Sequence, residues 1–137
     1  MGNESFLLKL EDRVEGDDLL NALDLIEEIK SVGGYVNESG MVMVYHRTTQ
    51  QNADAIYSSG VMKAMENGLF FSSKENGYND GYGDAVIRLF IPAELLVLDD
   101  VFNDEAHFCL PLGNKRSFDV SDMLISIERG KGGRASE

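Results

Sequence analysis

Short apolar runs separated by turn residues are the feature that most constrains how this chain folds. Most runs are bounded by Gly, Asn, Asp or Pro, and they occupy residues 41–46, 69–72, 85–91, 96–98, 107–112, 117–120 and 123–127. Runs of this length predict β-strands, and short strands joined by turns favour a mixed or antiparallel sheet. Because helical patterns precede most of them, the sequence predicts an α+β domain.

The strongest helix pattern lies near the start of the chain, over residues 17–32. Its apolar residues recur at three- and four-residue spacings, which predicts one buried stripe. The stripe consists of Leu19, Leu20, Leu23, Ile26 and Ile29. Asp17 or Asp18 is expected to cap this helix, and the glycine pair at 33–34 is expected to end it.

A second, shorter helix is expected over residues 50–59, with Thr49 as its cap and Gly60 as its stop. Residues 61–68 are interpreted as a connection. Residues 92–95 are interpreted as a single helical turn, because proline is permitted at the first helical position.

Length and composition indicate one folded unit. The chain has 137 residues, of which 43% are hydrophobic, enough for one packed core. We therefore expect a single domain over residues 1–129, followed by a flexible, Gly- and charge-rich tail over residues 130–137.

The charge is strongly acidic. There are 24 Asp and Glu residues against 12 Lys and Arg, a net charge of -12. Such a surface repels phosphates, so direct nucleic-acid binding is not expected. The charge has two interpretations: it keeps the protein soluble, or it occupies the basic, nucleic-acid-binding groove of a partner protein.

The cysteine content and hydropathy bear on the compartment. Cys109 is the only cysteine, so neither an internal disulfide nor a cysteine-based zinc site can form, and an apolar strand is its expected surrounding. No apolar run is long enough for a signal peptide or a membrane span. We expect a soluble, cytoplasmic protein without a membrane partner.

Three groups of residues are candidates for ligand binding. His46 ends an apolar run and is followed by Arg47 and Thr48 at the start of a helix, which suits an anion or a ribose, although a histidine at a strand end is often structural. Ser72 and Ser73 end the next run and join that site only if the two strands are neighbours. The third group is a glycine-rich loop over residues 77–84, whose two tyrosines can stack on a flat ring.

Acidic residues gather around the later strands. Asp99 and Asp100 are expected to close one strand, and a turn over residues 103–105 is expected before His107. Carboxylates near a histidine can bind a metal or act as a general base, but this spacing matches no metal-binding motif. No metal site is therefore predicted.

Several short stretches, taken in order, carry a family resemblance. They are residues 45–49 (Tyr-His-Arg-Thr-Thr), 52–56 with Gly60, 68–73 (Gly-Leu-Phe-Phe-Ser-Ser), 81–88, 91–92, 98–100 and 104–107. Together they resemble the ADP-ribosyltransferase fold over about residues 41–112. The chain is similar to the histidine-containing branch, which includes poly-ADP-ribose polymerases, diphtheria-type toxins and tRNA 2′-phosphotransferases, and to small bacterial and phage-encoded proteins assigned to that fold.

The resemblance implies two small, split and strongly bent sheets with NAD, as substrate, in the cleft between them. It implies that His46 holds the nicotinamide ribose and amide region, with Thr48 as the small polar partner. Arg47 stands where many relatives carry a glycine, and it belongs to the implied cofactor-binding set. Phe71 and Ser72 correspond to the lining of the nicotinamide pocket.

Two further roles follow from the same resemblance. Tyr78 or Tyr82 corresponds to the aromatic side chain that stacks on nicotinamide. Glu105 corresponds to the glutamate at the start of a late strand, which stabilises the oxocarbenium-like ribose as nicotinamide leaves. A register shift of two residues would put His107 at this position instead.

The function that the resemblance implies is NAD-dependent mono-ADP-ribosyl transfer to a macromolecular target, with a protein as the expected target. The alternative is a catalytically inactive, acidic, phage-encoded inhibitor that imitates nucleic acid and blocks a host or defence protein such as a CRISPR effector. A structural accessory domain is a third interpretation.

Overall fold

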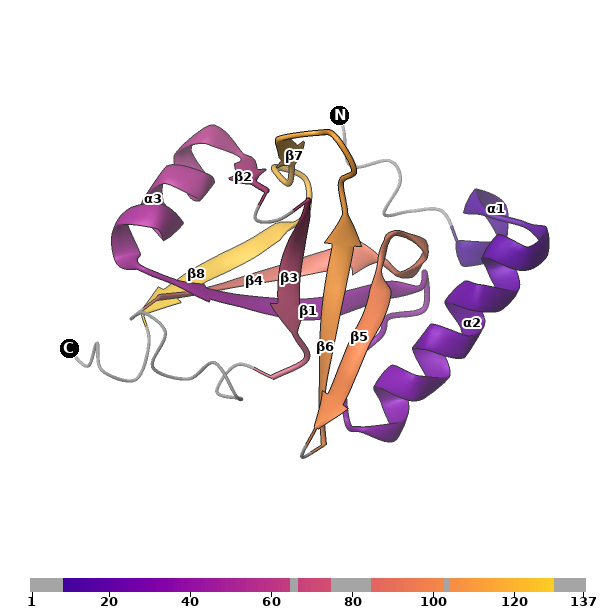
Figure 1. The fold of residues 1–137 in the computed structure, drawn as a ribbon. Coiled ribbons are helices and arrows are strands. Elements are labelled where there is room, and N and C mark those ends of the chain that lie inside the picture. Colours follow the sequence, from indigo (N-terminus) through magenta and orange to yellow (C-terminus); the bar gives the residue numbers. More distant parts are fainter. Residues whose placement is uncertain (1–8, 65–66, 75–84, 103, 130–137) are drawn as a thin grey trace.

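The computed structural model describes residues 9–64, 67–74, 85–102 and 104–129. Helices and antiparallel sheets occur together in this part of the chain, which confirms the α+β class (Figure 1). The predicted tail over residues 130–137 lies outside the described residues, as do Tyr78 and Tyr82. Within the described ranges, no helix combines the length and the apolar character needed to cross a membrane.

The helices lie in the first part of the chain, with one short helical turn later. They are α1 (Leu10–Arg13), α2 (Gly16–Ser31), α3 (Gln50–Ser59) and the 3₁₀ helix η2 (Ala93–Leu95). The strands are β1 (Met41–Thr48), β2 (Val61–Lys63), β3 (Gly68–Ser72), β4 (Ala85–Pro92), β5 (Val97–Phe102), β6 (Glu105–Pro111), β7 (Ser117–Asp119) and β8 (Leu124–Arg129). The main sheet has the order β5-β6-β3-β1-β4-β8, and β2 pairs with β7.

The main sheet consists of two parts that run across one another. In Figure 1, β3, β6 and β5 cross over the direction of β1, β4 and β8. β1 pairs with β4 along its whole length, whereas β1 and β3 are joined in the described register by the pair Tyr45 and Ser72. A short junction of this kind leaves the two parts of the sheet free to twist away from each other.

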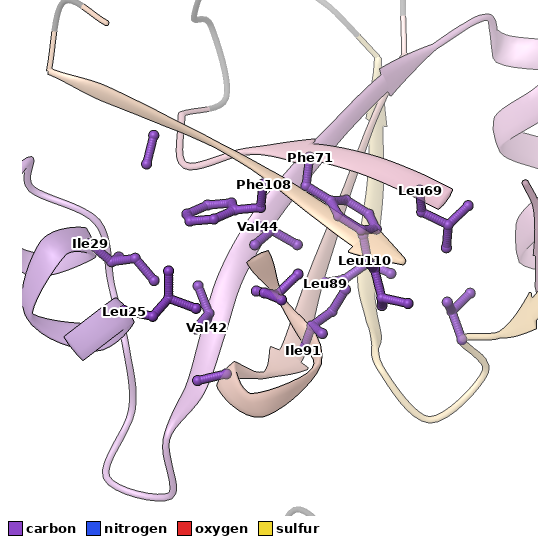
Figure 2. Close-up of a cluster of buried hydrophobic side chains, with 14 of the residues drawn as sticks. Leu25, Ile29, Val42, Val44, Leu69, Phe71, Leu89, Ile91, Phe108 and Leu110 are labelled. Carbon is purple, nitrogen blue, oxygen red and sulfur yellow. The ribbon is translucent and has the colours of Figure 1, made fainter. Parts of the chain in front are cut away.

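The hydrophobic core lies on one face of this bent sheet and is closed by α2. Figure 2 shows Leu25 and Ile29 of α2 beside Val42 of β1, with Phe71 and Phe108 arriving from the other part of the sheet. Each side chain of this size contributes about 1.5–3 kcal/mol when it is fully buried. The core therefore fixes how the two parts of the sheet sit against each other.

Helix α2 follows the prediction in its extent but not in its buried face. Leu20 and Leu23 are 59% and 44% exposed, while Leu25 and the small Ala22 are buried instead. The buried face is centred on Ala22, Leu25, Ile26 and Ile29, and Leu19 packs against the same core. The predicted stripe is therefore wrong at Leu20 and Leu23 and right at its other three positions. The N-cap is Glu15, which makes no side-chain cap bond, and the predicted caps lie in the first turn, where their charge suits the helix dipole.

Helix α3 is confirmed in its extent and at both ends, and Ala53 and Ile56 form its packing side as expected, whereas Tyr57, expected on the same side, is 62% exposed. The hydroxyl of Thr49 accepts the N–H of Asn52 at 3.1 Å, and Gly60 ends the helix with a φ of 72°. Both signals are local, which is why the sequence shows them. The connection predicted after Gly60 is wrong, since Val61–Lys63 forms β2 and pairs with Ser117–Asp119.

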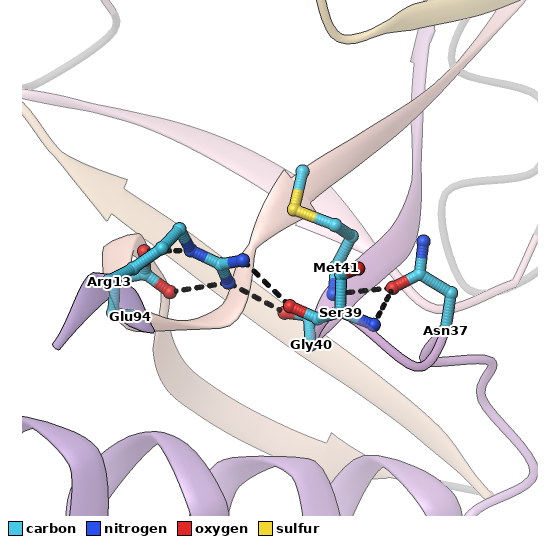
Figure 3. Close-up of polar contacts among 6 residues, drawn as sticks. All are labelled: Arg13, Asn37, Ser39, Gly40, Met41 and Glu94. Carbon is cyan, nitrogen blue, oxygen red and sulfur yellow. Dashed lines mark hydrogen bonds and ion pairs between the residues drawn. The ribbon is translucent and has the colours of Figure 1, made fainter. Parts of the chain in front are cut away.

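Arg13 ties helix α1 to the turn before β1 and to η2, which follows β4. Arg13 donates from Nε and Nη2 to the two carboxylate oxygens of Glu94, at 2.7 and 3.0 Å (Figure 3). Its Nη1 donates to the carbonyl of Ser39 at 2.7 Å. In the same turn, the side chain of Asn37 accepts the N–H groups of Ser39 and Met41. The bidentate pair thus joins α1 to η2, and Nη1 of the same guanidinium joins both to the turn before β1.

We expect Arg13→Met to lower the free energy of unfolding by about 2–4 kcal/mol, because it leaves the largely buried Glu94 carboxylate without its partner. Urea denaturation measures this loss. Arg13→Met combined with Glu94→Leu should cost less than the sum of the two single changes, and Lys30→Met, at an exposed position of α2, serves as the control. Strict additivity would contradict the proposed tie.

Candidate functional site

A buried carboxylate is the centre of the candidate site. Glu105, the first residue of β6, is 4% exposed. The hydroxyl of Ser72 donates to its Oε2 at 2.5 Å, and Nε2 of His107 lies 2.9 Å from the same oxygen. Because a buried polar group is costly unless it is hydrogen-bonded, these two contacts explain how the carboxyl group is accommodated in the fold.

The hydrogen of the Ser72 hydroxyl has a fixed direction. The oxygen of this hydroxyl also accepts the backbone N–H of Lys74 at 3.0 Å. With that contact made, the single O–H hydrogen is directed at Glu105. The serine is therefore an oriented donor rather than a freely rotating hydroxyl.

Local backbone features place Glu105. Asp104 has a φ of 62°, a left-handed conformation that aspartate tolerates better than most residues. The pair Phe102 and Glu105 closes the hairpin between β5 and β6. Ser73 then extends the pairing, since its N–H donates to the carbonyl of Ala106 and its hydroxyl accepts the N–H of Ala106, both at 2.9 Å.

His46 lies at the junction of β1 and β3. Its Nδ1 is 3.0 Å from the carbonyl oxygen of Phe70, and its ring contacts the edge of Phe71 with centroids 5.9 Å apart. Because a carbonyl can only accept, Nδ1 carries the hydrogen and Nε2 is the acceptor nitrogen of the neutral ring. Burial lowers the pKa of His46 from its ordinary value of 6.5, against the opposing effect of the Phe70 hydrogen bond.

The strand register assigns His46 and Glu105 to opposite faces of the sheet. His46 is paired with Ile87 and shares the core face with Phe71. Ser72 is paired with His107, whose side of β6 also carries Glu105. Since successive side chains of a strand alternate between faces, the structure brings Ser72, Glu105 and His107 together and does not bring His46 onto their face.

The other predicted binding residues on β1 and β3 are buried. Arg47 is 7% exposed and lies on the face opposite His46. Thr48 accepts the side-chain N–H of Asn52 at 3.2 Å, which links the end of β1 to α3. Phe71 belongs to the hydrophobic core. Tyr78 and Tyr82 lie outside the described residues.

A row of polar side chains crosses the sheet on the Glu105 face. The pairs run from Asp100 to His107, from His107 to Ser72, from Ser72 to Tyr45, and from Tyr45 to Arg88. We call these five residues the polar row. The row ends in the carboxylate of Asp100 on β5 and in the guanidinium of Arg88 on β4. Within it, His107 and Arg88 are three strand spacings apart, which is about 14 Å.

A cavity of about 430 Å³ lies beside the polar row at the β5 edge. Its lining residues are Phe70, Phe71, Asp99, Asp100, Phe102, His107 and Phe108. His107 lines the cavity and also contacts Glu105. The side chain of His107 therefore lies between the cavity and the Glu105 carboxylate. β5 runs through Asp99 and Asp100 to Phe102, so the predicted end of this strand at those two aspartates is wrong.

The neighbouring thiol is not activated. Burial raises the pKa of Cys109, and the charge of Asp99 raises it further. A thiol with a raised pKa is a poor nucleophile at neutral pH. In the described part of the chain, no group of three or more His, Cys, Asp or Glu residues is arranged to hold a metal ion.

Comparisons with protein-family models, with curated protein sequences and with solved structures found no match.

We expect the stability of this protein to fall with acid partly through His46. Its pKa is lowered in the folded state, so the unfolded chain takes up the proton first. The stabilisation by the neutral ring is therefore present above about pH 6.5 and is lost as the pH falls through that value towards the lower folded pKa. His46→Gln should show a smaller loss of unfolding free energy between about pH 7.5 and about pH 5.5 in urea denaturation. Parallel pH profiles for the two proteins would contradict this.

Proposed function

We propose that this protein binds NAD and transfers its ADP-ribose unit to a macromolecular target, with Glu105 as the catalytic carboxylate. The observation that carries the proposal is the buried carboxylate of Glu105 at the start of β6, held by the oriented hydroxyl of Ser72 and by His107. This is the residue type and the strand position that the family resemblance implies.

The chemistry needs a fixed negative charge. When the bond between ribose C1′ and the nicotinamide nitrogen breaks, positive charge develops on the sugar. A carboxylate that is already oriented in a water-poor site stabilises that charge without having to reorganise. Nicotinamide leaves as a neutral molecule with the electron pair of the broken bond, the target nucleophile bonds to C1′, and the proton of the nucleophile passes to water.

The polar row supports the binding of a dinucleotide. Arg88 lies on the same face as Ser72, two strands away through Tyr45. A guanidinium there suits a pyrophosphate, because its fork of N–H groups matches phosphate oxygens. The charge along the row therefore changes from negative near Glu105, where the sugar cation would form, to positive where phosphates would bind.

His46 takes a positioning role in this proposal. By donating to Phe70 and contacting Phe71, it fixes the end of β3 from which Ser72 reaches Glu105. The direct contact of His46 with the nicotinamide ribose, which the resemblance implies, stays a prediction. Calorimetric titration of NAD into the wild type and His46→Ala distinguishes the roles, since loss of a direct contact weakens binding itself.

We expect Glu105→Gln to lower nicotinamide release from NAD about 100-fold or more, with little change in NAD affinity, because the lost charge acts on the transition state. Ser72→Ala should lower the rate less, since the carboxylate remains. Asp104→Asn, the adjacent exposed carboxylate, is the control. The measurement is nicotinamide formation with purified protein. Equal rates for wild type and Glu105→Gln would remove Glu105 from the chemistry.

The exposed side of α2 favours a second candidate, an acidic inhibitor that imitates nucleic acid. The helix presents carboxylates to solvent around Leu20 and Leu23, which are exposed. These carboxylates are Asp17, Asp18, Asp24, Glu27 and Glu28. Such a surface combines a phosphate-like charge pattern with two apolar contacts for a basic groove.

The second candidate predicts displacement of duplex DNA from a basic nucleic-acid-binding protein, such as a CRISPR effector, without NAD. Fluorescence anisotropy of labelled DNA measures it, and the effect should weaken steeply with salt. The triple change Asp24→Asn, Glu27→Gln and Glu28→Gln should reduce displacement, whereas Glu105→Gln should not. Displacement that is insensitive to the triple change would argue against this surface.

A further inference from the structure

We propose that the cavity at the β5 edge is a docking site for an arginine side chain of a protein partner. The inference concerns the cavity alone and does not depend on NAD. It rests on three observations: the volume of about 430 Å³, two exposed phenylalanine rings in its lining, and two successive carboxylates that a backbone irregularity directs to the same place.

The irregularity is a β-bulge in β5. Leu98 is paired with Phe108 and Asp100 with His107, which leaves Asp99 as an extra residue between them. In a regular strand, adjacent side chains point to opposite faces, whereas a bulge re-aims one of them. Asp99 and Asp100 accordingly both line the cavity. Two carboxylates concentrated beside His107 make this a site that attracts a cation.

The aromatic side chains in the lining favour a planar cation over a compact one. Phe70 of β3 is 41% exposed and Phe102 of β5 is 49% exposed, on either side of the row that contains His107. Because both residues line the same cavity, they give it apolar aromatic surface beside its two carboxylates. A cation over an aromatic face gains attraction from the ring, and a planar guanidinium stacks there while its N–H groups remain free for carboxylates. A guanidinium therefore fits better than a compact, strongly hydrated ammonium group.

The partner is inferred from charge and exposure. Asp99 and Asp100 are exposed, as is Val97 of the same strand, so the cavity opens at the edge of the sheet beside further apolar surface. A protein surface that carries an arginine can cover this edge, whereas a small free cation would leave it uncovered. The net charge of -12 favours approach of a basic partner.

The test uses the whole chain and three probes: a five-residue Gly/Ser peptide with one central arginine, the same peptide with lysine, and ethylguanidinium. Binding is measured by NMR titration, following the ring signals of Phe70 and Phe102. We expect the arginine peptide to shift both sets of ring signals and to bind several-fold tighter than the lysine peptide. Asp100→Asn should weaken it about tenfold and Phe70→Leu about three- to tenfold.

The matched control is Asp122→Asn, which removes the same charge at an exposed position outside the cavity lining. It should change the affinity less than about twofold. The proposal is overturned if Asp122→Asn weakens binding as much as Asp100→Asn, because general charge would then explain the attraction. It is also overturned if lysine binds as well as arginine, if ethylguanidinium binds as tightly as the peptide, or if no probe shifts the ring signals.

Discussion

The contact between β1 and β3 is the constraint on which the rest of the structure depends. One residue pair, Tyr45 with Ser72, joins the two parts of the main sheet in the described register. Next to this pair, Nδ1 of the His46 ring lies 3.0 Å from the carbonyl oxygen of Phe70 and adds a side-chain contact between the two strands. The bend that results encloses the core on one face (Figure 2) and carries the polar row across the other.

One face of the sheet carries the hydrophobic core, and the other carries the residues of the proposed site. On the core face, burial lowers the pKa of His46, which favours the neutral ring that donates to Phe70. On the other face, Glu105 keeps its carboxylate buried through Ser72 and His107. His107 in turn borders the cavity, so one side chain connects the proposed transfer site with the proposed docking site. A partner bound at the cavity would lie next to the group proposed to act on it.

Elements with local signals were predictable from the sequence. Thr49 and Gly60 mark both ends of α3, and turn residues separate most strands. Elements whose formation depends on residues far away in the sequence were not predictable. β2 has three residues and exists through its pairing with β7, far along the chain. Leu20 and Leu23 fit the helical period, yet the sheet meets α2 on a slightly different face.

The same limit applies to the candidate site. Ser72 and Glu105 were identified from the sequence as candidate site residues. That they touch each other follows from the pairing of β3 with β6, which the sequence does not show. The polar row and the bulge at Asp99 require the register of several strands, which no single run of residues encodes. Phe70 and Phe102 look like ordinary strand residues until their exposure is known.

The bulge in β5 has a further consequence for how this protein behaves at high concentration. β5 is an edge strand of the main sheet as described, and an edge strand offers unpaired backbone groups to any other extended chain. The bulge and the two adjacent charged side chains hinder such pairing, because the backbone groups of a regular strand cannot align with those of a bulged one. Asp99 and Asp100 thus also guard the sheet against growing by addition of further strands, which lets exposed apolar residues such as Val97 and Phe102 remain at this edge.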